Sequence, residues 1–337
     1  MASEKQQASS PQIKVSVIIP AYNTAHLIAA CLDSVFAQTF HDLEAIDFEA
    51  IVVNDGSPDT AELEKVMRPY LDRHPDRLVY IKQVNKRAAG ARNTAIAQAR
   101  GEFLAFLDSD DVWLPNHLES QIKQFEADPA LCLAYANAVM VGDPKRHVEF
   151  MTRCPSVGEA GFEALVVERC QIPVSTVVAR KTAILKAGGF DESLARCDDY
   201  NMWLRTAFYG RKVGYNRQVQ ARLADGRPGS LGLSRARMAE AYWMILEKAD
   251  QNLPLTPEQR ELVRRRAAEI HAHFLLEDGK NHLRERDFKK ARERFAEANH
   301  YLHRLKVSLV LLGLTLAPNA TRRLYSLWTQ RHTGAPA

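Results

Sequence analysis

Three short apolar runs in the first third of the chain constrain its fold more than any other feature. They span residues 15–19, 49–53 and 102–107, and a further strand is expected near residues 78–82. Stretches with helical character lie between them, the first from about residue 25 to residue 37. Strands that alternate with helices form a parallel sheet with right-handed connections. The sequence therefore predicts an α/β fold built on a mostly parallel sheet flanked by helices.

Polar or turn-forming residues follow each of these apolar runs. The three strings are Pro20-Ala21-Tyr22-Asn23, Asn54-Asp55-Gly56-Ser57 and Asp108-Ser109-Asp110-Asp111. The carboxyl ends of parallel strands meet at one edge of the sheet, where α/β proteins bind ligands. Gly56 permits a turn with positive φ, and Asp55 and Ser57 are residues that can cap the helix that follows. An ordinary turn is the alternative interpretation of the second string.

The third string brings three carboxylates together at the end of a buried strand. Crowded carboxylates repel one another unless a cation lies among them. Hard oxygen ligands suit Mg²⁺ or Mn²⁺. A solvated acidic turn that caps the next helix is the alternative, and Asp111 in particular is expected to cap a helix beginning near Pro115.

Six strings in order resemble the family 2 inverting glycosyltransferases, which have the GT-A (Rossmann-like) fold. Besides the three strings above, the matching segments are Gly90-Ala91-Arg92-Asn93, Gly188-Gly189-Phe190-Asp191-Glu192 and Asp198-Asp199-Tyr200-Asn201-Met202-Trp203-Leu204-Arg205. The resemblance covers a catalytic domain of residues 13–235. It implies transfer of a sugar from a nucleotide-sugar to an acceptor hydroxyl.

The resemblance also implies roles for single acids. Asp108 and Asp110 match the pair that holds a divalent metal, Mn²⁺ or Mg²⁺, on the donor diphosphate, with Asp110 as the direct ligand. Asp199 matches the general base that takes the proton of the acceptor hydroxyl, and Asp198 stands where the family has Glu. The alternative role of both acids is to stabilise the dipole of the helix expected over residues 200–209.

Nucleotide-sugar contacts are assigned by the same resemblance. The expected residues are Pro20, Ala21, Tyr22, Asn54, Asp55, Arg87, Arg92, Asp108 and Ser109. Asn54 departs from the family, which commonly has an Asp there that accepts the uracil imide N–H. An amide oxygen still accepts a hydrogen bond but carries no charge. The resemblance therefore still implies a UDP-sugar, but Asn54 weakens the case for uracil as the base. A loop with Arg227, Ser230 and Ser234 is expected to contact phosphate. The alternative for Arg87 and Arg92 is that they are ordinary charged residues on the surface of a helix.

Composition is consistent with a cytoplasmic enzyme. The 337 residues carry a net charge of +4, which argues against general nucleic-acid binding. The five cysteines show no paired metal-binding spacing, and their odd number without a signal peptide suggests reduced thiols. No apolar run reaches the roughly 18 residues of a membrane span, and a Gln-x-x-Arg-Trp string typical of polymerising relatives is missing. Residues 1–12 are expected to be a disordered tail, and single-sugar addition is favoured over processive synthesis.

The C-terminal region, residues 236–337, is expected to be helical. Residues 278–300 resemble a single tetratricopeptide unit, but one unit does not make a repeat array. Residues 261–337 carry a charge of +7, and basic residues flank the apolar stretch 307–317. Residues 306–331 are thus a candidate for peripheral contact with the inner face of a membrane. The alternative is a helix buried against the protein.

The function that we predict from sequence is metal-assisted, inverting transfer to a saccharide or lipid-linked saccharide in surface glycan synthesis. One alternative is a nucleotidyltransferase, although the string after the first strand is not the Gly-rich, Lys-containing loop expected of that class. The other is a catalytically inactive nucleotide-sugar-binding module. The joint presence of Asp108, Asp110 and Asp199 argues against it.

Overall fold

The computed structural model describes residues 13–40, 47–142, 148–224 and 235–333. The chain divides into two compact units, one of residues up to 230 and the other from residue 231 onward. The predicted tail of residues 1–12 and the predicted loop with Arg227, Ser230 and Ser234 lie outside the described residues.

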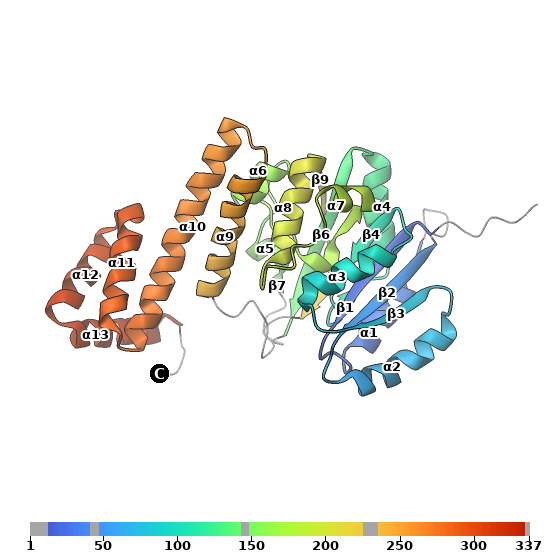
Figure 1. Ribbon diagram of the computed structural model, residues 1–337, viewed down its shortest axis with the longest axis horizontal. Coiled ribbons are helices and arrows are strands. Elements are labelled where there is room, and N and C mark those ends of the chain that lie inside the picture. The colour runs from blue at the N-terminus through green and yellow to red at the C-terminus, as the bar shows by residue number, and fades with distance from the viewer. Residues whose placement is uncertain (1–12, 41–46, 143–147, 225–234, 334–337) are drawn as a thin grey trace, which may run out of the picture. The chain divides into compact units, whose positions relative to one another are not determined.

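A single mixed sheet forms the N-terminal unit, and its first half is parallel. The parallel strands are β1 (Val15–Ala21), β2 (Phe48–Asp55), β3 (Leu78–Gln83) and β4 (Phe103–Phe106). They lie side by side in the order β3-β2-β1-β4 (Figure 1). The predicted α/β class is confirmed, and the carboxyl ends of these strands meet at one edge.

The second half of the sheet contains the antiparallel strands, which the sequence analysis did not identify. It continues from β4 through β8 (Val178–Arg180), β6 (Leu131–Val141), β9 (Lys212–Ala224) and β5 (Val112–Trp113), with β7 (Val148–Glu149) paired to β6. β8 runs antiparallel to both β4 and β6, and β9 is parallel to β6. Among the described residues four strand pairs are parallel and four are antiparallel, so the sheet as a whole is mixed and only its first half is parallel throughout.

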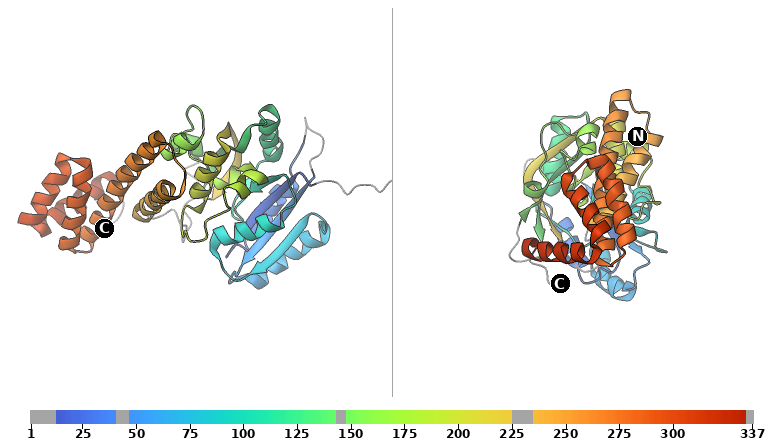
Figure 2. Two further views of the ribbon diagram at one scale, coloured as in Figure 1. Left: turned by 45° about the horizontal axis from the view of Figure 1, so that its top comes forward. Right: turned by 90° about the vertical axis from the view of Figure 1, so that its left-hand side faces the viewer.

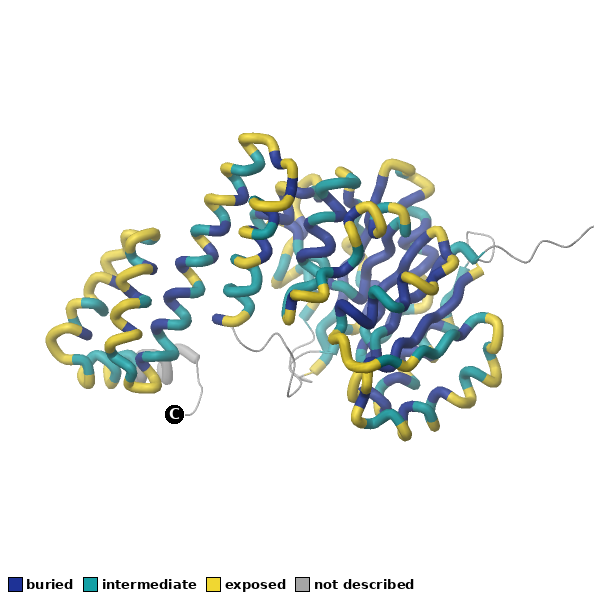
Figure 3. The backbone as a smooth tube through the Cα atoms, viewed as in Figure 1, coloured by how far each residue is buried: buried dark blue, intermediate teal, exposed yellow. Residues whose placement is uncertain are grey.

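Burial on both faces of the sheet explains why the strands consist of continuous apolar runs. All eight residues of β2 are buried, and Figure 3 shows the central strands as continuous buried segments. Successive strand residues point to opposite faces. Val17 and Ile19 of β1 therefore pack in a core with helical residues such as Leu63, while Ile18 is buried on the other face. A strand buried on both faces needs a continuous apolar run, as observed.

Helices cover the sheet and connect its strands. They are α1 (Ile28–Phe36), α2 (Thr60–Arg73), α3 (Arg87–Gln98), α4 (His117–Ala127), α5 (Phe150–Arg153), α6 (Phe162–Val166), α7 (Lys181–Lys186), α8 (Asp198–Gly210) and the short 3₁₀ helix η1 (Val174–Thr176). α3 packs on β1 and β2 and also contacts α8. That contact brings α3 and α8, which are far apart in the sequence, close together in the folded N-terminal unit.

The C-terminal unit is helical in its described residues. It contains α9 (Arg235–Asn252), α10 (Pro257–Arg284), α11 (Phe288–Leu302), α12 (Leu305–Leu316) and α13 (Pro318–Thr333). Each helix packs against the next, as the orange-to-red segments of Figure 2 show. Thr256 starts α10 with a capping box to Gln259, and Pro257 occupies the first turn, where its missing N–H has no cost.

A second apolar core belongs to this unit. The tetratricopeptide-like positions Ala291, Phe295 and Ala298 are buried in it, and so are Val307 and Leu314 of α12. None of the described helices combines the length and the apolar character that crossing a bilayer requires.

Candidate active site

The acid string lies just beyond β4, as predicted. Ligand oxygens of Asp108, Asp110 and Asp111 all lie within 4.8 Å of one another. Asp111 is buried, whereas Asp108 and Asp110 keep part of their surface exposed. Behind them Phe106 packs edge-on against Trp203, with ring centroids 5.2 Å apart. The strand that leads to the acid string is therefore packed among buried aromatic side chains.

The prediction that Asp111 caps the next helix is wrong. Its carboxylate accepts hydrogen bonds from the Ser175 hydroxyl at 2.5 Å and from the Ala224 backbone N–H at 2.8 Å. α4 begins at His117, after Asn116, without a side-chain cap. The residue after Asp111 begins β5, so Asp111 turns toward the sheet interior and not toward the helix. Burial, and then repulsion from Asp108, raises the pKa of Asp111 to about 7.

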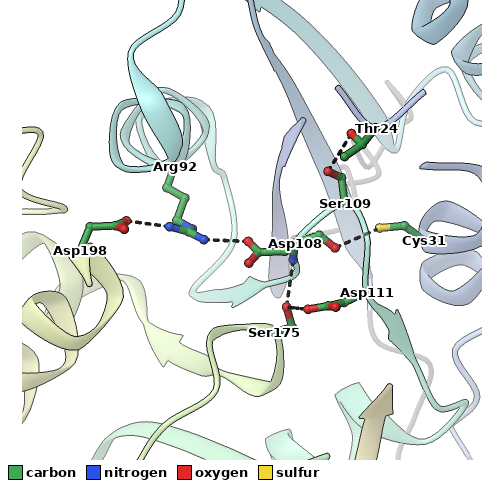
Figure 4. A network of polar contacts seen from close by, with 8 residues as sticks. All are labelled: Thr24, Cys31, Arg92, Asp108, Ser109, Asp111, Ser175 and Asp198. Atoms are coloured by element: carbon green, nitrogen blue, oxygen red, sulfur yellow. Dashed lines mark hydrogen bonds and ion pairs between the residues drawn. The ribbon is translucent and has the colours of Figure 1, made fainter. Parts of the chain in front are cut away.

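Arg92 joins the acid string to the acidic start of α8. One guanidinium nitrogen donates to Asp108 at 2.7 Å, and another donates to Asp198 at 2.7 Å (Figure 4). The Arg92 side chain is buried, which by itself would lower its pKa, but the carboxylates of Asp108 and Asp198 raise it. Arg92 is therefore a fixed cation between two carboxylates from distant parts of the chain.

The candidate base, Asp199, occupies the first turn of α8. Cys197 precedes the helix in the left-handed conformation, with φ of 55°, and its carbonyl accepts the N–H of Asn201. Removal from water and the adjacent Asp198 carboxylate raise the pKa of Asp199 to about 6, while Arg92 opposes the increase. Asp199 keeps part of its surface exposed. A partly accessible carboxylate with this pKa is suited to accept a proton near neutral pH.

Two further motif residues fasten the loop before α8. Asn93 donates to the carbonyl of Phe190 at 2.9 Å and accepts the N–H of Phe190 at 2.8 Å. Arg205 of α8 donates to the carbonyls of Ala187 and Gly189. These contacts explain why the Gly-Ala-Arg-Asn, Gly-Gly-Phe-Asp-Glu and Asp-Asp-Tyr-Asn strings occur together: they form one network around the two acidic clusters.

Asn54 and Asp55 have structural partners at the end of β2. The Asn54 amide donates to Thr60 and Tyr80 and accepts the N–H of Ser57, all at 2.9 Å. Asp55 accepts from Gln83 and from the backbone N–H of Lys86, each at 2.7 Å. Their predicted contacts with a nucleotide stay predictions.

The predicted capping of α2 by Asp55 and Ser57 is wrong. α2 follows Asp59 and has no side-chain cap, whereas Asp55 binds the backbone just before α3. Ser57 instead accepts the N–H of Asn23 at 2.6 Å. That bond ties the ends of β1 and β2 together, because these strands are neighbours in the sheet.

The other predicted donor-contact residues differ in exposure. Pro20 and Ala21 end β1, and Tyr22 beyond them is exposed. Arg87 is exposed at the start of α3. Ser109 is buried, and its hydroxyl donates to Thr24 at 2.9 Å.

Ser175 is a site residue that the sequence reasoning missed. Its hydroxyl donates to Asp111 and accepts the N–H of Asp108 at 3.0 Å, and Trp113 donates to its carbonyl at 2.6 Å. Ser175 lies in η1, more than 60 residues from these partners. Nothing in the sequence around Ser175 predicts that it bonds to the acid string. Its position there depends on the pairing of β8 with β4.

The acid string fits a hard divalent cation. Three carboxylates share a small volume, and repulsion from Asp108 contributes to the raised pKa of Asp111. Additional positive charge at this place would relieve that repulsion. Asp108 and Asp110 are less buried than Asp111, so they are the residues that would hold a metal beside a bound substrate.

Residues 16–182 match the model of the family described as Glycosyl transferase family 2. An uncharacterised glycosyltransferase of Rickettsia prowazekii is 31% identical over 245 residues, which cover 71% of this chain and 72% of that protein. The Escherichia coli glucosyltransferase WfgD, named for transfer from UDP-Glc to α-D-GlcNAc-diphosphoundecaprenol, is 31% identical over 56% of this chain and 68% of its own length.

Solved structures share the fold. S. aureus TarS 1-349 in complex with UDP-GlcNAc superposes with a TM-score of 0.61 at 18% identity, over 94% of this chain and 92% of that one. The mannosyltransferase PcManGT from Pyrobaculum calidifontis, in complex with GDP-Man and Mn²⁺, has a TM-score of 0.60 at 22% identity, over 93% and 83% of the two chains. At these identities the likeness concerns the fold alone.

Proposed function

The chain belongs to glycosyltransferase family 2, and on that premise we propose that it transfers a single sugar from a nucleotide-sugar to an acceptor hydroxyl with inversion at the anomeric carbon. Inversion in one step requires a base on the face opposite to the leaving nucleotide. Asp199 is that base in our proposal, and Asp108 and Asp110 hold a divalent metal, Mn²⁺ or Mg²⁺.

The observation that carries the proposal is the Arg92 bridge. A base and a diphosphate-binding site serve one displacement only if they lie close together and in a fixed geometry. Arg92 bonds to Asp108 of the acid string and to Asp198, the neighbour of Asp199, at 2.7 Å each. Two acidic clusters 90 residues apart in sequence thus share one buried cation.

Each group of the chain has a distinct part in the reaction. Asp199 accepts the proton of the acceptor hydroxyl as that oxygen attacks the sugar. Arg92 bonds to Asp198, the neighbour of Asp199, and its charge keeps the pKa of Asp199 from rising further. A divalent metal bound by Asp108 and Asp110 supplies charge stabilisation for the leaving nucleoside diphosphate.

We favour a UDP-sugar as the donor. The name of the relative WfgD gives UDP-Glc as its donor, and TarS binds UDP-GlcNAc, whereas PcManGT binds GDP-Man. The proposed donor-contact residues are Tyr22 beyond β1, Asn54 and Asp55 at the end of β2, and Arg87 at the start of α3. Pro20, Ala21 and Ser109 shape the same edge.

For the acceptor, we favour a lipid-linked saccharide of surface glycan synthesis. The acceptor in the name of WfgD is an undecaprenol-linked sugar. We accordingly propose that the reaction takes place in the cytoplasm, at the inner face of the membrane. The product is extended by one sugar and is not a polymer.

Product analysis tests this proposal. The purified chain is incubated with Mn²⁺, a lipid-linked saccharide and, in turn, UDP-Glc, UDP-GlcNAc or GDP-Man. Release of a nucleoside diphosphate together with a product one sugar heavier is expected. Pyrophosphate release would instead indicate a nucleotidyltransferase, and donor binding without turnover would indicate an inactive binding module. A ladder of products would contradict single addition.

A further inference from the structure

A row of exposed leucines runs along α12. Leu305, Leu309, Leu312 and Leu316 are 74%, 59%, 55% and 75% exposed. Their spacing of four, three and four residues places them on one face of a helix with 3.6 residues per turn. We call these four residues the leucine row.

The leucine row lies opposite the face that holds α12 in its unit. Val307 and Leu314, half a turn away from the row, are the buried residues of α12 and belong to the C-terminal core. The remainder of the helix is exposed or half-buried (Figure 3). Packing within the unit therefore accounts for one face of α12 and leaves the leucine row in contact with water.

The chain segment that carries the leucine row is positively charged. Residues 298–337 contain no Asp or Glu, and their basic residues are Arg304, Lys306, Arg322, Arg323 and Arg331. The exposed side chains of Arg304 and Lys306 border the first turn of α12, and Arg323 is exposed in α13. The side chain of Arg331 lies outside the described residues.

We propose that the leucine row is an interfacial contact with an anionic lipid surface. Apolar side chains on one face of a helix enter the boundary between headgroups and acyl chains, and basic residues beside them attract anionic headgroups. α12 is too short to span a bilayer, so the contact is peripheral. The contact rests on the proposed location at the inner face of the membrane, and its failure would leave the proposed sugar transfer itself intact.

A second copy of the chain is the competing occupant. The four-three-four spacing also suits a seam between two helices, but such seams are sustained over at least about three heptads, and the row covers less than two. Two copies would also bring their positively charged surroundings together, which is unfavourable. The charge favours anionic lipid.

Co-sedimentation of the full chain with vesicles tests the proposal. We expect binding to vesicles that contain phosphatidylglycerol, no binding to pure phosphatidylcholine, and loss of binding at high salt because charges are then screened. Leu309→Gln together with Leu312→Gln should weaken binding at least about tenfold, since two apolar side chains leave the interface. Leu185→Gln is the matched control, because Leu185 is equally exposed, at 55%, but lies in the N-terminal unit.

Charge variants give an independent readout. Lys306→Gln should weaken binding about fivefold, whereas Lys65→Gln, an exposed lysine in α2, should have little effect. A full-length protein that stays in the supernatant at low salt would overturn the proposal. So would unchanged vesicle binding by the leucine double variant. Conversion of a dimer to a monomer by that variant, with vesicle binding unaffected, would assign the row to a second copy.

Discussion

At the scale of single residues, the site separates its carboxylates by environment. Asp199 has a pKa raised to about 6, and Asp111, hydrogen-bonded inside the sheet, has a pKa raised to about 7. Asp108 and Asp198 are instead paired with Arg92. Groups that differ in this way are suited to different tasks, and the substitutions below separate those tasks.

Asp199→Asn should lower kcat by roughly two to four orders of magnitude, the usual contribution of general base catalysis. The amide keeps the shape of the side chain but accepts no proton. Donor affinity, measured by calorimetry with a nucleotide-sugar and Mn²⁺, should stay close to that of the wild type. Near-normal turnover would assign the base role to another acid, with Asp198 the first to examine.

Asp110→Asn should weaken Mn²⁺-dependent donor binding and nearly abolish transfer. Asp111→Asn is the matched control, because the Asp111 carboxylate is engaged by Ser175 and Ala224 and its loss should mainly affect stability. Titration of donor binding with Mn²⁺ measures the difference. Full activity of the wild type in excess chelator would remove the metal from the mechanism.

The Arg92 cation lowers the pKa of Asp199, so its removal should raise that pKa further. In Arg92→Gln the acidic limb of the kcat/KM profile should therefore move to higher pH. Arg92→Lys keeps the charge and should move the limb less, although it loses the paired hydrogen bonds. An identical limb in Arg92→Gln and wild type would show that Asp199 does not control the profile.

At the scale of elements, the loop between α7 and α8 determines where the base lies. Asn93 of α3 and Arg205 of α8 bond to backbone groups of this loop from two sides. Gly189 within it has φ of +70°, and a Cβ atom there would lie 3.0 Å from the Asn93 side-chain oxygen. Backbone conformation and close packing both favour glycine at this position.

Gly189→Ala should destabilise the protein by more than the ~1–2 kcal/mol expected for the left-handed backbone alone, because it also displaces Asn93. Gly158→Ala is the matched control. Gly158 has φ of +72°, but a Cβ atom there would meet nothing within 4 Å. Denaturant unfolding of both variants measures the difference, and equal losses would contradict a steric role for Asn93.

At the scale of the whole molecule, carboxylates with raised pKa values link stability to pH. Asp111 and Asp199 have pKa values of about 7 and about 6 in the folded chain, against an ordinary value of 3.8. Between about pH 4 and pH 7 the folded state retains protons that the unfolded state releases. The free energy of unfolding contributed by these groups is therefore greatest at low pH and falls as pH rises through this range.

Without metal, this contribution should lower the melting temperature of wild type relative to Asp111→Asn as pH rises from about 4 to 7. Mn²⁺ should counteract the fall at pH 7, since it binds the folded acid string. Melting curves in chelator and in Mn²⁺, at several pH values, measure both effects. Parallel pH dependence of the two proteins would contradict an unusual pKa at Asp111.

The sequence alone determined the α/β class, the first four strands, the edge where their polar ends meet, and the acids at that edge. These properties follow from local patterns: continuous apolar runs, turn residues at fixed positions, and short strings in a familiar order. The same patterns located Asp108, Asp110, Asp198 and Asp199.

Only the tertiary structure decided how those residues are connected. From the sequence, Arg92 could be either a nucleotide-sugar contact or a charged surface residue. Its place between Asp108 and Asp198 depends on the contact of α3 with α8. The burial of Asp111 and the role of Ser175 depend on β8 entering the sheet beside β4. Hydrogen bonds between residues 60 or more positions apart leave no trace in local composition, because either partner alone is an ordinary polar residue.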